Sequence, residues 1–268
     1  ALFFVLVSPR FALVLPALLM LFFAVSTEPV DERTRAASIG ALFQGITRPE
    51  RDWVDRAVDG KVAAIWTGRN DSLTVLENEF FSRAVGPVFT LAGPLPGGLA
   101  QTPLSPDVDT GALLEETGRG AAVQYALVDD SVPLAGAIAG RDARKGLRIV
   151  RVAGPLRLTH QVTGVYGDGW SGASVVYRRY ECTGGSVLVT TESDPNLFRR
   201  SQIVRALAGN RVLARGRIPR DGVGQLRVPL EPERGVCAVR LVVSPTVVPG
   251  GGDSRRLGTH FRSFAFSS

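Results

Sequence analysis

Three patterns of hydrophobic and polar positions follow one another along the chain, and each predicts a different structure. The first is a continuous apolar run, the second alternates helix-like and strand-like segments, and the third consists of short strand-like segments separated by turns. Together they predict an α+β protein. We expect an N-terminal transmembrane segment (1–28), a juxtamembrane helix with a small α/β layer (29–154), and a C-terminal jelly-roll-like β-sandwich (155–268).

The apolar run has the length of a membrane-spanning helix. Residues 9–27 would form a helix of about 28 Å at roughly 1.5 Å per residue, close to the roughly 30 Å of a bilayer's hydrocarbon core, and Glu28-Pro29 would end it. A second apolar run, residues 2–7, precedes it. We therefore expect the last transmembrane helix of a truncated polytopic protein, retained in the cell membrane. A cleaved signal peptide is the alternative.

The middle pattern predicts helices and strands in alternation. A mixed segment at 31–46 predicts the juxtamembrane helix, and a capping box at 47–50 precedes a helix whose apolar face includes Trp53 and Val58. A further helix is expected over 73–83. The strands predicted around these helices are "KVAAIWT", "PVFTLAG" and residues 122–128, 134–139 and 147–152.

The C-terminal pattern contains only strands and turns. Apolar and polar positions alternate in short segments, which is typical of strands with one face in a core. Seven or eight such strands predict a sandwich of jelly-roll type. The segments are "PLRLTHQVTG", "SGASVVYRRYE", "SVLVTTES", "QIVRALAG", "RVLARGRI", "GQLRVPL", "CAVRLVVSPTVVP" and "HFRSFAF".

The net charge of +6 is divided unevenly. Residues 1–140 hold 10 basic and 16 acidic residues, a net of −6, whereas residues 141–268 hold 21 basic and 9 acidic residues, a net of +12. The basic residues are almost all arginines, which can recognise phosphate groups. Since they are scattered along strands without an aromatic-studded groove, we interpret them as solvated strand faces and expect no nucleic-acid partner.

Two cysteines are present, and each lies in a strand-like segment. Cys182 follows "YRRYE" and Cys237 begins "CAVRLVV". A structural disulfide across strands in an oxidising compartment would explain the pair. Two buried free thiols are the alternative.

The sequence predicts no catalytic residue, metal site or cofactor. Asp109 lies in an Asp-Thr-Gly tripeptide, but aspartic protease chemistry needs two carboxylates. Ser171 does not fit the nucleophile-elbow spacing. His160 and His260, the only histidines, have no further ligands at metal-binding spacing.

The segment "GVYGDGWSG" (164–172) is the richest local motif. We interpret its glycines as the turn at which the α/β layer leads into the sandwich. Trp170 can fill the core at that junction, which is the role we favour, or it can stack on a sugar. In the second case Tyr166, Asp168 and Trp170 would form a carbohydrate site, in which Asp168 accepts hydroxyl hydrogen bonds.

The chain resembles the C-terminal extracytoplasmic region of bacterial, especially actinobacterial, polytopic membrane glycosyltransferases of the C superfamily, which are related to protein mannosyltransferases. The resemblance rests on the apolar helix, "LENEFFSRAVGPVF", "GPLRL", "GVYGDGW" and "DSRRLGTHFRSFAF", in this order. It implies polyprenyl-phosphate sugar donors and catalytic loops between early membrane helices. Those loops are not part of this sequence, and no catalytic residue is carried over.

The expected function is that of an accessory module of such an enzyme in cell-envelope glycan assembly. Its partners would be the membrane and a glycan or lipid-linked sugar, and most of the chain would be extracytoplasmic. This part alone is not expected to be catalytic. The alternative is a membrane-anchored, non-enzymatic carbohydrate-binding or envelope protein.

Overall fold

The computed structural model describes residues 52–68, 77–79, 81–91, 93 and 101–268, which are mostly β-structure. Residues 50–268 belong to one compact unit. The predicted transmembrane segment, the juxtamembrane helix and the capping box lie outside the described residues. Of the helix predicted over 73–83, residues 73–76 and 80 also lie outside them, and residues 77–79 and 81 are helical. In the described part of the chain, no helix combines the length and apolar character needed to cross a bilayer.

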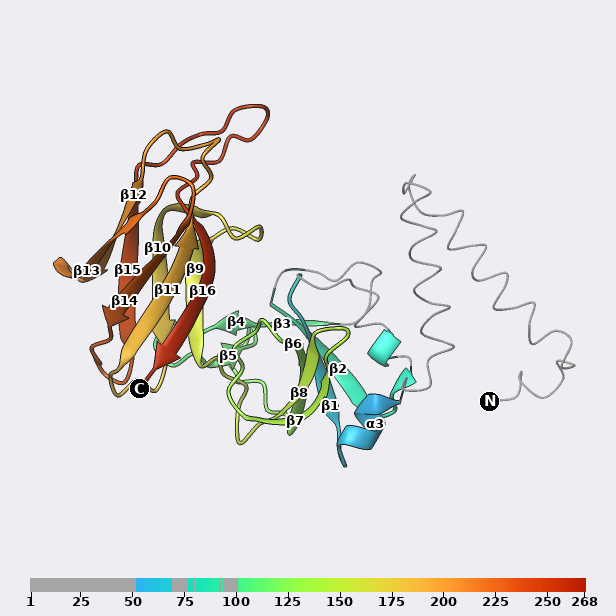
Figure 1. The fold of residues 1–268 in the computed structure, drawn as a ribbon. Coiled ribbons are helices and arrows are strands. Elements are labelled where there is room, and N and C mark those ends of the chain that lie inside the picture. The colour runs from blue at the N-terminus through green and yellow to red at the C-terminus, as the bar shows by residue number, and fades with distance from the viewer. Residues whose placement is uncertain (1–51, 69–76, 80, 92, 94–100) are drawn as a thin grey trace, which may run out of the picture. The chain divides into compact units, whose positions relative to one another are not determined.

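A six-stranded mixed sheet forms the first part of this unit (Figure 1). Its strand order is β3-β2-β1-β6-β8-β7, with parallel neighbours from β3 to β6 and antiparallel neighbours from β6 to β7. The strands are β1 (Val62–Trp66), β2 (Val85–Thr90), β3 (Thr102–Pro103), β6 (Tyr125–Asp129), β7 (Ala137–Asp142) and β8 (Leu147–Arg151).

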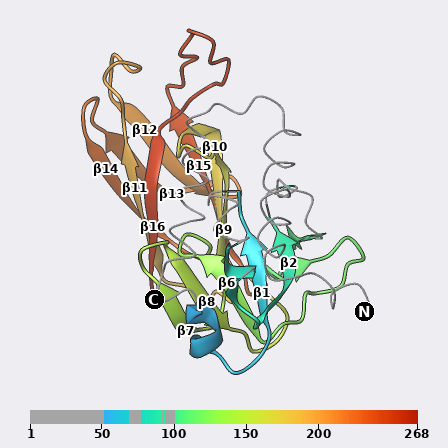
Figure 2. The ribbon, with the colours of Figure 1, turned by 90° about the vertical axis from the view of Figure 1, so that its right-hand side faces the viewer.

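Both faces of this sheet are covered, which explains the unbroken apolar run of β1. The short helix α3 (Trp53–Ala57) lies beside β7 (Figure 2), and its Val54 packs with Val62 and Ile149 on one face. Ala63 and Ile65 alternate with these residues and face a second cluster on the other side. A strand buried on both faces has no polar positions to alternate with.

β7 begins three residues later than the apolar run 134–139 predicted. Leu134 is not part of the strand. It forms a bridge with Leu158, and both side chains are buried in the second cluster together with Leu156. A short ribbon of β4 (Ser105–Pro106) and β5 (Leu113–Leu114) adjoins this region. An apolar residue just before a strand can therefore pack in the core without belonging to the sheet.

The remaining strands form two antiparallel sheets, consistent with the expected β-sandwich. The five-stranded sheet has the order β13-β12-β15-β10-β9, and the three-stranded sheet has the order β14-β11-β16 (Figure 1). The strands are β9 (His160–Val165), β10 (Ser171–Arg179), β11 (Ser186–Glu192), β12 (Gln202–Ala208), β13 (Arg211–Ile218), β14 (Val223–Pro229), β15 (Cys237–Ser244) and β16 (His260–Ser267).

Alternation along the strands places one face of each sheet in a shared core. In β15, Val239, Leu241 and Val243 are buried while the residues between them point outward. Tyr177 of β10 stacks on Phe264 of β16, with ring centroids 5.6 Å apart, and so connects the two sheets. Period-two alternation is the pattern expected when each sheet has one solvated face.

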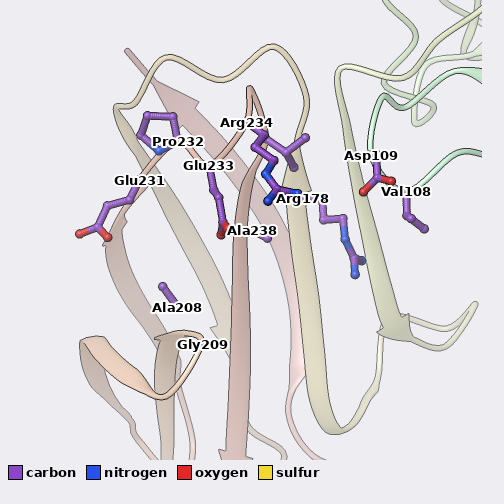
Figure 3. A pocket seen from close by; sticks show the side chains of 11 residues that line it. Val108, Asp109, Arg178, Ala208, Gly209, Glu231, Pro232, Glu233, Arg234 and Ala238 are labelled. Carbon is purple, nitrogen blue, oxygen red and sulfur yellow. The ribbon is translucent and has the colours of Figure 1, made fainter.

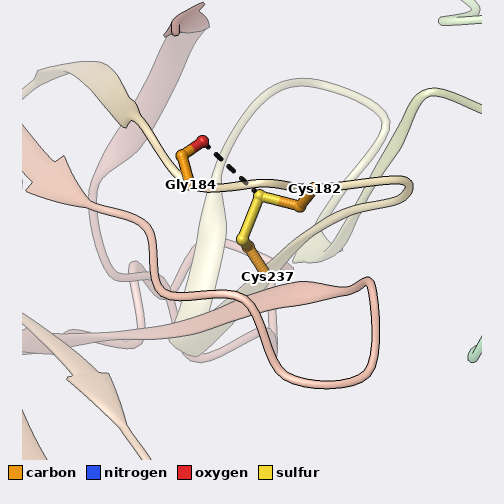
Figure 4. Close-up of a disulfide and its surroundings, with 3 residues drawn as sticks. All are labelled: Cys182, Gly184 and Cys237. Carbon is orange, nitrogen blue, oxygen red and sulfur yellow. Dashed lines mark hydrogen bonds between the residues drawn. A yellow bond between two sulfur atoms is a disulfide. The ribbon is translucent and has the colours of Figure 1, made fainter.

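A disulfide joins Cys182, just after β10, to Cys237 at the start of β15 (Figure 4). The Sγ atom of Cys182 lies 3.6 Å from the carbonyl oxygen of Gly184. Both cysteines are buried in the sandwich core. The structure therefore has the bonded pair and not two free thiols.

Candidate functional site

The "GVYGDGWSG" segment forms the hairpin turn between β9 and β10. The backbone N–H of Tyr166 donates to the carbonyl of Trp170 at 2.7 Å, and the N–H of Gly169 donates to the carbonyl of Tyr166 at 2.9 Å. The turn thus lies within the sandwich. The predicted role as a junction between the two layers was wrong, because β9 already precedes the glycines and pairs with β10.

Two of its glycines are required by the backbone. Gly164 has φ +86°, and a Cβ there would lie 2.3 Å from the carbonyl oxygen of Ser174. Gly169 has φ +84°, and a Cβ there would lie 2.4 Å from Nε2 of His260. Residues with side chains rarely adopt this left-handed conformation. The glycines therefore allow a tight turn to lie directly against His260.

Gly169→Ala should destabilise the protein by about 1–2 kcal/mol, the usual cost of a left-handed alanine. It should also displace His260. Gly167→Ala is the matched control, because a Cβ at Gly167 meets no atom within 4 Å. Thermal melts of both variants test this, and equal melting temperatures would contradict the assigned role of Gly169.

The turn is fixed to the start of β16 by several hydrogen bonds. The N–H of Phe261 donates to the carbonyl of Gly169 at 2.9 Å, and the N–H of Ser171 donates to the carbonyl of Thr259 at 2.9 Å. Nε2 of His260 lies 3.0 Å from the carbonyl oxygen of Asp168. Because a carbonyl oxygen only accepts, this contact places a proton on Nε2.

Tyr166 and Asp168 are both engaged by Arg255, which lies in the loop before β16. The Asp168 carboxylate accepts from the guanidinium at 2.9 Å, and Asp253 accepts from the same group at 2.8 Å. The guanidinium also lies 4.9 Å from the ring centroid of Tyr166, a cation–π distance. These contacts hold the turn to the Asp253 loop.

The arginine lowers the pKa of both carboxyl groups. Its side-chain hydrogen bonds lower the pKa of Asp168, and they lower that of Asp253 to about 2. The Arg255 pKa is raised, chiefly by its hydrogen bond to Asp253. A carboxyl group whose pKa is lowered by folding stabilises the folded state above its usual pKa. This contribution is lost as the pH falls toward the folded value.

Arg255→Gln should therefore lower the melting temperature at pH 5–7, where both carboxylates are charged in the folded and unfolded states. The difference from the wild type should shrink as the pH falls below about 4 and vanish near pH 2. Parallel thermal melts over this range measure it. A difference that stays constant down to pH 2 would show that Arg255 acts by packing and not by charge.

The backbone N–H of Trp170 donates to Asp168 Oδ1 at 3.4 Å, but its side chain lines a small pocket of about 300 Å³. The side chain is half-buried, and its ring meets that of His260 edge to face, with centroids 5.6 Å apart. Trp170 is not among the residues of the sandwich core. The arrangement favours the platform alternative over the core role.

Polar groups from the β11–β12 connection complete the pocket. Its other lining residues are Glu192, Ser193, Asp194 and Pro195. Ser193 is only 4% exposed, and its Oγ has no hydrogen-bond partner among the described residues, nor has Nδ1 of His260. The Glu192 carboxylate accepts from Nε of Arg262 at 2.7 Å. Both unpartnered atoms are shielded from the pocket, so the polar groups that a ligand can reach there are the half-buried carboxylates of Glu192 and Asp194.

A second, larger hollow of about 880 Å³ lies near the end of β10 and the start of β15 (Figure 3). Asp109 faces it from the first part of the unit, and Arg178, Glu233 and Arg234 face it from the sandwich. Its floor consists of small residues such as Ala208 and Ala238. Asp109 has no second carboxylate in a shared-proton arrangement there, and among the described residues no cluster could hold a metal ion.

The structure thus divides the three predicted carbohydrate-site residues. Tyr166 and Asp168 bind Arg255, and only Trp170 lines the pocket. Sequence reasoning missed His260, Glu192 and Ser193. His260 lies within the quoted segment "DSRRLGTHFRSFAF", but nothing in the spacing links it to a tryptophan 90 residues away.

Neither the protein-family models nor the curated proteins compared with this chain give a match. The geometry of the pocket is therefore the basis for the functional conclusion.

Proposed function

We propose that this chain is the C-terminal extracytoplasmic module of a polytopic membrane glycosyltransferase that uses polyprenyl-phosphate sugar donors in cell-envelope glycan assembly. In this proposal the transmembrane helix leads into an α/β layer and a jelly-roll-like sandwich, and catalysis belongs to loops elsewhere in the enzyme. The module binds a neutral glycan at the Trp170 pocket.

One observation carries the glycan-binding part. The half-buried Trp170 ring lines the same pocket as the half-buried carboxylates of Glu192 and Asp194. A sugar offers an apolar face for the ring and hydroxyl groups that can donate to those carboxylates. The two carboxylates also disfavour an anionic ligand.

Two further features support the wider proposal. With β9 counted as strand 1, the five-stranded sheet has the order 5-4-7-2-1 and the three-stranded sheet has the order 6-3-8. The 5-4-7-2 and 6-3-8 orders support a jelly-roll-like sandwich, an architecture found in lectin domains, although β9 lies beside β10 and not beside β16. The Cys182–Cys237 disulfide is typical of an oxidising compartment, which agrees with an extracytoplasmic position.

Trp170→Ala should weaken binding of a soluble neutral oligosaccharide roughly tenfold, because an aromatic contact contributes about 1.4 kcal/mol at the upper end of its range. The full chain in a non-ionic detergent can be tested on an array of mannose-, arabinose-, galactose- and glucose-based oligosaccharides. Since Trp170 is only half-buried, the melting temperature should change by a few degrees at most.

Tyr166→Ala is the matched control, because Tyr166 belongs to the same turn but contacts Arg255 outside the pocket. It should retain binding. Loss of binding in both variants, or in neither, would argue against the Trp170 pocket. A large drop in melting temperature for Trp170→Ala would restore the core role for this residue.

A further inference from the structure

The outward face of the five-stranded sheet carries an unbalanced set of arginines. β9, β10, β12, β13 and β15 contain seven arginines and no acidic residue. Arg211 pairs with Glu231, and Arg179 lies over the ring of Phe266. The other five make no ion pair with any described residue, and we call them the arginine face: Arg178, Arg205, Arg215, Arg217 and Arg240.

The strand register places these arginines close to one another. Arg205 of β12 lies directly opposite Arg215 of β13, and Arg217 lies two residues farther along the same strand. Arg240 of β15 lies opposite Leu207 of β12. Like charges directly opposite one another destabilise a sheet. An anionic partner on this face would remove that repulsion.

Apolar side chains are interleaved with the arginines. The half-buried outward positions beside them are aliphatic, and the face offers no aromatic ring on which a base could stack. These positions are Val176, Ile203, Leu207 and Val242. Guanidinium groups among aliphatic side chains suit the interface of a membrane, where phosphate groups border the acyl chains.

Acidic side chains meet this face at one end only. Asp109, Glu231 and Glu233 line the hollow that Arg178 and Ala238 also line, and the other acidic residues of 141–268 lie in turns, at strand ends or outside the sheet. The outward face of the three-stranded sheet has no comparable cluster, and Arg227 there donates to Ser186. The asymmetry defines one docking face of the sandwich.

From this charge complementarity we infer that the arginine face docks on a membrane surface rich in anionic phospholipid. The inference is independent of glycan binding at Trp170. Each arginine near such a surface should change the ratio of docked to undocked protein roughly fivefold. Docking would hold the sandwich with its five-stranded sheet toward the lipid.

Energy transfer to labelled lipid tests the inference on the full chain. Both native cysteines are bonded, so Ser174→Cys, on the arginine face, or Ala265→Cys, on the other sheet, provides a single thiol for a donor dye. The chain is reconstituted into vesicles that contain acceptor lipid, made of phosphatidylcholine alone or of phosphatidylcholine with about 30% phosphatidylglycerol.

Transfer from position 174 should rise when phosphatidylglycerol is present and should fall back at high salt, whereas transfer from position 265 should not rise. In Arg205→Gln/Arg215→Gln the docked ratio should fall roughly 25-fold, two fivefold steps. Arg144→Gln/Arg227→Gln removes two exposed arginines elsewhere and should behave as the wild type.

The inference is overturned if both lipid compositions give the same transfer from position 174, or if the double variant on the face keeps the rise. A rise at position 265 equal to that at 174 also overturns it. Binding of a single-stranded oligonucleotide without any response to phosphatidylglycerol would assign the face to nucleic acid instead. Thermal melts of the variants confirm that each is folded.

Discussion

Removing the disulfide should destabilise the protein by about 4 kcal/mol, the value that the chain-entropy model gives for a closed loop of this length. Cys182 and Cys237 are 55 residues apart in sequence and both are buried. Cys182→Ala/Cys237→Ala should therefore lower the melting temperature by roughly 8–16 °C for a unit of this size. Scanning calorimetry of the full chain in detergent measures the change.

Alkylation of the unfolded wild type without reductant provides the control. Intact mass should show no labelled thiol before reduction and two afterwards. Two labelled thiols before reduction, or a double variant that melts with the wild type, would contradict the assigned bond. A substitution at an exposed site, such as Arg144→Gln, should leave the melting temperature close to that of the wild type and serves as the reference.

Leu241→Ala should cost about 3 kcal/mol, within the range measured for leucines truncated in cores. Leu241 is 1% exposed in the middle of β15, where it lies opposite Val175 of β10 and Ala206 of β12. Its neighbours belong to two strands and cannot close the cavity without breaking the register. Thermal or chemical denaturation measures the loss.

Val242→Ala is the matched control, since it lies on the same strand and its side chain points outward, half-buried. It should cost well under 1.5 kcal/mol, because little cavity is created. Similar losses of stability for the two variants would contradict the assignment of Leu241 to the core side of β15 and Val242 to its outward side.

The strands could be predicted from the sequence because alternation marks them one by one. Segments such as 237–244 and 186–192 alternate strictly, since one side faces the shared core. The start of β7 could not be predicted in this way. Leu134 pairs with Leu158, and its apolar character reflects this contact and not a place in the strand. The pattern of residues around Leu134 does not reveal a contact with a residue so far along the chain.

The candidate site was only partly predictable for the same reason. Glycine and aromatic residues marked the turn at 164–172, and Trp170 proved to line a pocket. The groups that decide its chemistry come from far along the chain. His260 contacts Trp170 only because β16 lies beside the turn. Asp168 forms an ion pair with Arg255, which no spacing in the sequence predicts.

The indole signal of Trp170 tests the central claim most directly. In ¹⁵N-tryptophan-labelled full chain, the three tryptophans give separate indole N–H resonances, and Trp170→Phe assigns the one of interest. Titration with a neutral oligosaccharide that binds on the array should shift the Trp170 signal. The Trp53 signal should stay in place, since its indole Nε1 donates to Asn78 away from the pocket. A bound oligosaccharide that leaves the Trp170 signal unmoved would contradict the assignment of this pocket as the glycan site.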